Sequence, residues 1–140
     1  ENDATRRPRR MSTAPKTRAL PSPGIGPDNE AFVAAPKEGR FVLRHCDDCG
    51  KTHWYPRAVC PHCWSSRTQW KVASGLGTVY SYSTMQRVDP PYTLAYVTLD
   101  EGPTMLTNLV GPGPYRIGMP VQVQFQPSDD GTPVPVFAPA

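Results

Sequence analysis

The second half of the chain consists of short runs in which apolar and polar residues alternate. The alternation is strict over residues 119–125, where Val121, Val123 and Phe125 fall on one face. A period of two is typical of a half-buried β-strand. Four further runs are rich in strand-forming residues: 78–85, 92–99, 104–110 and 133–137.

Glycine and proline separate these runs. Gly75 and Gly77 predict a sharp bend or bulge before the first strand, and residues 100–103 carry the residue types of a hairpin turn. Prolines interrupt the last run, which favours a position at a sheet edge. About five strands in roughly seventy residues is the number expected for a small barrel that closes its own edges, such as an OB-fold.

The residues before these strands predict two smaller elements. Asp28 is a candidate N-cap for a short helix that begins at Asn29, and Pro36 should end or distort this helix before an exit turn at Gly39. A helix this short is not stable alone, so Phe32 is expected to pack on a neighbouring module or a partner. Residues 40–45 and 52–55 predict two strands.

The chain contains four cysteines, and all of them lie within residues 46–63. Cys46 and Cys49 form one CxxC pair, and Cys60 and Cys63 form another. Each pair can fold as a knuckle, and two facing knuckles give the tetrahedral sulfur cage that structural zinc prefers. Two disulfides, and iron in a rubredoxin-like cage, are the alternatives. A complete cage leaves no open coordination position, so the metal is expected to be structural.

The ribbon that carries the cysteines is too small to bury a core of its own. Metal binding, worth roughly 10–16 kcal/mol in small zinc modules, must therefore supply most of its stability. His45, His53 and His62 lie near the site, and one of them replacing a cysteine ligand is a further alternative.

The basic residues are concentrated at the N-terminus. Six of the fifteen lysines and arginines lie in the first eighteen residues, and the remainder of the chain carries nine basic and ten acidic residues. Four thiolates around one zinc ion would add about two negative charges. A mildly acidic body is unfavourable for binding nucleic acid, whose affinity comes largely from phosphate neutralisation.

Residues 1–27 combine this basic cluster with a Pro/Gly-rich run and few apolar side chains. We expect them to be unstructured. They would be either a leader added for expression or a linker that follows an upstream domain. The chain has neither an apolar run long enough to span a membrane nor an N-terminal apolar signal segment. These features, and thiols available for metal, favour a cytoplasmic protein without membrane association.

Few residues suggest catalysis. The metal uses every cysteine, and Asp100–Glu101 and Asp129–Asp130 are more typical of turns than of acid/base pairs. No catalytic residue is therefore predicted. Trp54, Tyr55 and Trp64 are candidate interface anchors, with packing between ribbon and barrel as the alternative. Three arginines are candidates for contacting the phosphates of coenzyme A, with an ordinary surface role as the alternative: Arg57, Arg87 and Arg116.

Together these motifs resemble the zinc-ribbon/OB-fold family of acyl-CoA-associated proteins, long catalogued as a domain of unknown function. The resemblance covers about residues 28–126. It rests on Cys-x-x-Cys-Gly at 46–50, Pro-Arg-x-x-Cys-Pro-x-Cys at 56–63, Trp70, the segments 74–81, 91–92 and 97–102, and Gly118-x-x-Val121. The sequence departs from the family at Trp64, where glycine is usual after the last cysteine of the second knuckle, and at Pro36 in the helix.

The resemblance implies a mainly β protein with four parts: a leader at 1–27, a short helix at 28–40, a zinc ribbon at 41–72 and an OB-fold at 73–140. It also implies a non-catalytic subunit that forms a heteromer with a thiolase-fold enzyme, first of all a steroid side-chain-cleaving aldolase, and that helps to bind an acyl-CoA thioester. Ribbon and helix would dock on the enzyme. A partner enoyl-CoA hydratase or acetyl-CoA acetyltransferase, and a nucleic-acid-binding or electron-carrying role, are the alternatives.

Overall fold

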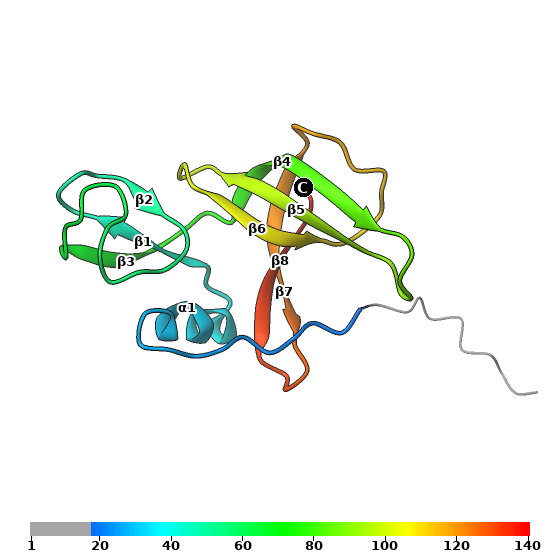
Figure 1. Ribbon diagram of the computed structural model, residues 1–140, viewed down its shortest axis with the longest axis horizontal. Coiled ribbons are helices and arrows are strands. Elements are labelled where there is room, and N and C mark those ends of the chain that lie inside the picture. The colour runs from blue at the N-terminus through cyan, green and yellow to red at the C-terminus, as the bar shows by residue number, and fades with distance from the viewer. Residues whose placement is uncertain (1–17) are drawn as a thin grey trace, which may run out of the picture.

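The computed structural model describes residues 18–140, and the part of the expected leader at 1–17 lies outside them. The chain folds into a small three-stranded ribbon, a short helix and a five-stranded barrel (Figure 1). The mainly β fold and the OB-type barrel predicted from the sequence are both confirmed. None of the helices among residues 18–140 is long and apolar enough to cross a lipid bilayer.

The ribbon is a sheet in which β1 (Val42–Cys46) lies between β2 (Thr52–His53) and β3 (Thr68–Val72). Both neighbours run antiparallel to β1. The pairing of β1 with β3 runs from Cys46 and Thr68 to Val42 and Val72. The ribbon thus presents the first knuckle directly at the end of its central strand.

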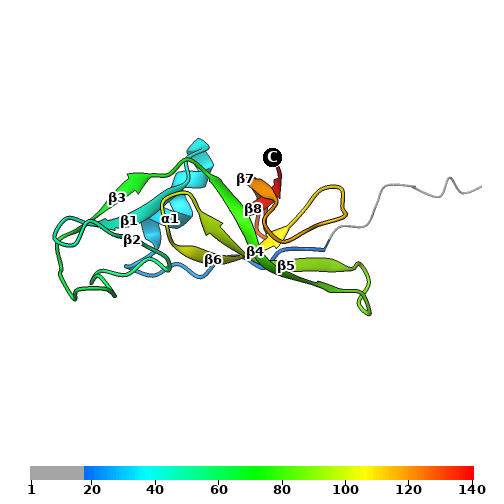
Figure 2. The same cartoon turned by 90° about the horizontal axis from the view of Figure 1, so that it is seen from above.

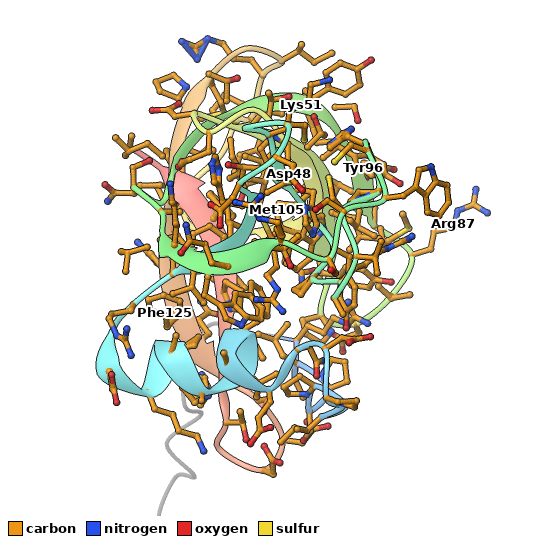
Figure 3. The ribbon with its side chains drawn as sticks, turned by 90° about the vertical axis from the view of Figure 1, so that its left-hand side faces the viewer. Asp48, Lys51, Arg87, Tyr96, Met105 and Phe125 are labelled. Carbon is orange, nitrogen blue, oxygen red and sulfur yellow. The ribbon has the colours of Figure 1, made fainter. Side chains whose placement is uncertain are left out.

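The barrel closes in the order β4-β5-β6-β8-β7. Its strands are β4 (Leu76–Met85), β5 (Tyr92–Leu99), β6 (Thr104–Leu109), β7 (Pro120–Pro127) and β8 (Pro133–Pro139). All neighbours are antiparallel except β6 and β8, which pair in parallel at Leu109 and Phe137. The β4–β5 hairpin extends beyond the rest of the barrel (Figure 2), and Arg87 from its tip lies at the periphery in Figure 3.

The edge position expected for residues 133–137 is wrong. β8 lies between β7 and β6, and Val136 and Phe137 are completely buried. The prolines are tolerated because β8 pairs with β6 at one residue pair only, so few of its backbone N–H groups are needed on that side. Closure of the barrel, which the local pattern does not encode, places this strand inside.

The helix α1 (Glu30–Ala34) continues as a 3₁₀ turn (Ala35–Glu38) that contains Pro36 and ends at Gly39 in the left-handed conformation. The distortion at Pro36 and the exit turn are therefore as expected. The predicted N-cap at Asp28 is wrong, because Asn29 occupies that position. The Asn29 side chain instead accepts a hydrogen bond from Gly26 N–H and donates to Tyr55 Oη, which joins the segment before the helix to the ribbon.

A row of aromatic rings connects the three parts of the fold. Trp54 of the ribbon packs on Phe32 of α1 with ring centroids 4.8 Å apart, and Phe32 contacts Phe41 just before β1 at 6.1 Å. Phe41 in turn meets Phe137 of β8 edge to face at 6.2 Å. Phe32, Phe41 and Phe137 belong to the same buried cluster as the barrel interior, which includes Met105. Helix, ribbon and barrel therefore share one hydrophobic core.

Residues 18–27 form neither helix nor strand, but part of this segment is fixed to the barrel. Leu20 is only 8 % exposed, and its carbonyl accepts a hydrogen bond of 2.9 Å from Asp129 N–H in the β7–β8 turn. The expectation that residues 1–27 lack structure throughout thus fails for this part. The attachment depends on a single apolar residue and a single backbone hydrogen bond. Neither can be recognised from the sequence.

Gly77 of β4 pairs with Leu99 of β5 in the antiparallel ladder of the barrel. A Cβ atom at this position would lie 2.7 Å from the carbonyl oxygen of Thr98 and 2.8 Å from a methyl group of Val97. We expect Gly77→Ala to lower the free energy of unfolding by about 1–3 kcal/mol through overpacking, measured by urea denaturation. Gly24→Ala is the control, because nothing lies within 4 Å of its added methyl group. Equal stability of the two variants would contradict this account.

Candidate metal centre

The two CxxC pairs form two knuckles with the same hydrogen bonds. In the first, Gly50 N–H donates to the Cys46 carbonyl at 3.0 Å. In the second, Trp64 N–H donates to the Cys60 carbonyl at 2.9 Å. The backbone N–H of His62 also points at the Cys60 sulfur, with N and Sγ 3.4 Å apart. Both turns therefore direct their thiols toward a common centre.

The four sulfur atoms lie within 4.8 Å of one another. Cys46 and Cys63 are 3.5 Å apart at Sγ, and Cys49 and Cys60 are 3.7 Å apart. Four sulfurs about 2.3 Å from a central zinc ion would be separated by about 3.8 Å along each edge of the tetrahedron. The geometry therefore fits one tetrahedral ion. It excludes the alternative of two disulfides, because all four cysteines are free.

The electrostatics of the cluster also favour a cation between the sulfurs. Burial raises the pKa of Cys60, but hydrogen bonds from the backbone N–H groups of His62 and Cys63 outweigh this effect and bring it to about 7. The backbone N–H of Ser65 lowers the pKa of Cys63, yet burial and the three neighbouring thiols raise it to about 12. Four thiolates at these distances repel each other, and a divalent ion between them would remove that repulsion.

The histidines do not join the cluster, since the only such group of ligands among residues 18–140 is the four cysteines. His45 Nδ1 lies 3.2 Å from Thr52 Oγ1. His53 is 1 % exposed, and burial lowers its pKa below the usual range, so this ring is neutral inside the ribbon. The side chain of His62 is exposed. The geometry therefore does not favour a histidine in place of a cysteine ligand.

Polar contacts join the segments that carry the two knuckles. Asp48 accepts a short hydrogen bond from Ser65 Oγ and forms an ion pair with Arg67 at 3.0 Å. Asp47 N–H donates to the Arg67 carbonyl at 2.9 Å, and Gln69 Nε2 donates to the Asp47 carboxylate at 2.7 Å. Asp48 and Lys51 of the first knuckle are labelled in Figure 3. These contacts hold the loops in register, so their residues have a structural role.

Trp64 has an unusual backbone conformation. Its φ angle is 65°, close to the 73° of Gly50 at the same place in the first knuckle. The second knuckle therefore keeps the turn that glycine would give, although a bulky residue in this conformation costs about 1 kcal/mol or more. The side chain gains no packing in return, because it is 81 % exposed. A contact outside this chain is a physical reason for such a residue.

Trp64 forms one end of an apolar surface that we call the second-knuckle patch, made of Tyr55, Val59, Pro61 and Trp64. The patch lines a hollow of about 550 Å³, and Arg57 and Asp28 also line it. Tyr55 is 50 % and Val59 41 % exposed. Trp54 differs from the other two candidate anchors, because it is half-buried against Phe32 and holds the ribbon on the helix. The sequence did not point to Val59.

The candidate carboxylates have local structural roles, and the candidate arginines lie on separate segments. Glu101 accepts hydrogen bonds from Ser74 N–H and Oγ, which holds the β5–β6 turn against the start of the barrel. The backbone N–H and hydroxyl of Thr132 and the hydroxyl of Ser128 lower the pKa of Asp130 far below its usual range, as expected for a turn carboxylate. The three candidate phosphate-binding arginines lie on three different segments, in the loop before Cys60, the β4–β5 turn and the β6–β7 connection: Arg57, Arg87 and Arg116.

Two family models match the chain. Residues 33–69 match the rubredoxin-like zinc ribbon domain of ChsH2, and residues 70–126 match the C-terminal OB-fold domain of ChsH2. A solved chain described as "Ltp2-ChsH2(DUF35) aldolase" is 37% identical, with a TM-score of 0.74 over 84% of this chain and 98% of that one. A DUF35-family protein of unknown function from Sulfolobus solfataricus has a TM-score of 0.63 at 17% identity, which shows the fold alone.

Two curated proteins are also similar. A "Probable enoyl-CoA hydratase alpha subunit" from Thermomonospora curvata is 38% identical over 136 residues; the match covers 91% of this chain but only 43% of that protein. A "DUF35 domain-containing scaffold protein" from Methanocaldococcus jannaschii is 31% identical over 100 residues, which cover 61% of this chain and 70% of that protein. With the knuckles, the closed barrel and these matches in agreement, this chain belongs to the ChsH2/DUF35 family, in which a rubredoxin-like zinc ribbon precedes an OB-fold.

Proposed function

We propose that this chain is a non-catalytic accessory subunit that binds and stabilises a thiolase-fold acyl-CoA enzyme. A steroid side-chain-cleaving aldolase, which catalyses a retro-aldol reaction, is the partner we favour. The observation that carries the proposal is the 37% identity to a ChsH2 (DUF35) chain solved as an Ltp2-ChsH2 aldolase, over nearly the whole length of that chain. The name of the archaeal relative, a scaffold protein, supports the same role.

The metal in this proposal is one structural zinc ion held by Cys46, Cys49, Cys60 and Cys63. Four thiolates complete a tetrahedral shell, so zinc here would stabilise the ribbon without offering a position to substrate. The ribbon would then serve as a rigid support for the second-knuckle patch. We place the protein in the cytoplasm, where thiols remain available for metal.

The second-knuckle patch is the surface we assign to the partner enzyme. Tyrosine, tryptophan and arginine are the residues that most often dominate binding energy at protein interfaces, and Tyr55, Trp64 and Arg57 lie together here. Arg57 is exposed. A matching surface should therefore be apolar at its centre, with a carboxylate for Arg57 at its margin.

Co-expression with the thiolase-fold enzyme encoded nearest to this chain tests the proposal. We expect the two proteins to co-elute from a size-exclusion column and the enzyme to be inactive or insoluble when expressed alone. Separate elution, together with full activity of the enzyme without this chain, would exclude the accessory role. The identity to the Thermomonospora curvata hydratase subunit favours an enoyl-CoA hydratase as a second candidate partner, to be tested in the same way.

A further inference from the structure

The outer face of β4, β5 and β6 is uncharged. None of the residues that form these three strands is a lysine, arginine, aspartate or glutamate. On this face Tyr96 of β5 pairs with Leu106 of β6 and with Ser81 of β4. Beside them, Leu94 of β5 pairs with Ser83 of β4. We call these five residues the barrel face.

The barrel face combines apolar side chains, hydroxyl groups and a hollow. Tyr96 is 49 % and Leu106 50 % exposed. The five residues, together with Met85, line a hollow of about 350 Å³, which can receive a side chain from another molecule. Surfaces that stay in water usually carry mixed charges, and an exposed apolar patch without them marks an interaction site. The barrel face is therefore suited to a partner surface that is also neutral.

The turns that join these strands carry the charges that the strands lack. Arg87 and Asp89 lie in the β4–β5 turn, and Asp100 and Glu101 lie in the β5–β6 turn. Because the strands are antiparallel neighbours, the two turns lie at opposite ends of the face (Figure 1). Asp89 already has an interaction within the chain, and Glu101 accepts a hydrogen bond from Ser74. Arg87 and Asp100 are both exposed, with opposite charges at opposite ends.

This distribution of charge is complementary to itself. Two copies can pack their barrel faces together about a two-fold axis that lies between the sheets and runs across the strands. The strands of the two copies then run in opposite directions, so Arg87 of each copy meets Asp100 of the other. A two-fold axis along the strands would instead place like charges together, which is unfavourable. Both arrangements bring the uncharged centre of one face onto that of the other.

We propose that the barrel face forms a two-fold dimer of this chain, with Tyr96 and Leu106 at the centre and Arg87 of one copy beside Asp100 of the other. The dimer does not rest on the accessory role, and it leaves the second-knuckle patch free. Three strands about 4.8 Å apart, with a rise of about 3.4 Å per residue, give a face of roughly 400 Å². A standard interface covers about 800 Å² of each partner. We therefore expect a dimer that dissociates on dilution.

Sedimentation equilibrium of the full chain alone, from micromolar to millimolar concentration, tests this interface. The mass should rise from the 15.4 kDa of one chain toward that of a dimer. Leu106→Glu should weaken the dimer at least tenfold, because each copy brings a like charge to the uncharged centre. Ile117→Glu is the matched control, since Ile117 is also exposed but lies in the β6–β7 connection, and it should leave the dimer unchanged. A monomer at millimolar concentration, or equal dimerisation of Leu106→Glu and the parent chain, would overturn the proposal.

Charge reversal in the two turns tests the arrangement without changing a strand. Arg87→Glu and Asp100→Arg should each weaken the dimer severalfold, because each variant creates two like-charge contacts. The double variant exchanges the two charges and should restore the affinity of the parent chain. Failure of the double variant to restore it would overturn the pairing of opposite ends.

Co-elution with the partner enzyme, measured separately, distinguishes this dimer from the accessory role. The Leu106→Glu variant should still co-elute with the enzyme, because its second-knuckle patch is unchanged. A monomeric parent chain whose Leu106→Glu variant no longer co-elutes would assign the barrel face to the enzyme and overturn the dimer. A chain that dimerises through this face but does not bind the enzyme would support the dimer and refute the accessory role alone.

Discussion

Replacing Cys60 with serine should abolish metal binding and unfold residues 41–72. Cys60 is completely buried, and its sulfur accepts a backbone hydrogen bond that organises the second knuckle. Metal binding contributes roughly 10–16 kcal/mol to small zinc modules, far more than the few buried side chains of the ribbon can replace. Zinc content by atomic absorption should fall from one equivalent to near zero. Amide hydrogen exchange should show loss of protection in β1, β2 and β3.

His62→Ala is the matched control for this experiment, because His62 neighbours Cys60 but its ring lies outside the sulfur cluster. This variant should keep one equivalent of zinc and a protected ribbon. Retention of zinc and protection in the serine variant would refute the four-cysteine site. Loss of zinc from His62→Ala would instead identify a histidine ligand. The barrel should keep its strand pairing in both variants, although loss of Phe41 from the shared core should lower its melting temperature when the ribbon unfolds.

Replacing Trp64 with glycine should change stability and binding in opposite directions. Glycine adopts a φ angle of 65° without steric penalty, so the ribbon should gain about 1 kcal/mol in stability. Loss of the indole should weaken the complex with the partner enzyme by 2 kcal/mol or more, about 30-fold in Kd, if Trp64 is an anchor of the interface. Thermal denaturation of the free chain and titration with the partner measure the two effects separately.

Ile117→Ala is the control for this second experiment. Ile117 is also largely exposed, at 71 %, but it lies in the β6–β7 connection and is not part of the second-knuckle patch. Its replacement should leave the affinity for the partner unchanged. Unchanged affinity of the Trp64→Gly variant would remove the second-knuckle patch from the interface, whereas a lower melting temperature would contradict the strain assigned to Trp64.

The sequence predicted those features that depend on spacing within one segment. The two CxxC pairs define the cluster because a knuckle is a local turn, and the strand-forming residues at 92–99 predict β5 with the bounds that the structure shows. The glycine-like turn at Trp64 could not be derived, because a tryptophan gives no local sign of a positive φ angle. Its departure from the family pattern and its exposed aromatic type marked this position, but not its backbone conformation.

Features that depend on closure or on distant contacts were not predictable. The last strand carries prolines that favour an edge, yet barrel closure buries Phe137 between two neighbours. Asn29 rather than Asp28 is the N-cap residue of α1, and its side chain contacts Gly26 and Tyr55, which lie far apart in the sequence. Arg18 lies within a basic stretch that we expected to lack structure, whereas the fold buries Leu20 and stacks Arg18 on the Tyr92 ring.

The row of rings from Trp54 through Phe32 and Phe41 to Phe137 prevents the ribbon from turning independently of the barrel. An enzyme that binds either the ribbon or the barrel would therefore also fix the orientation of the other. Whatever the barrel holds would be presented to that enzyme at a constant distance and angle, as a rigid spacer does and a flexible tether does not.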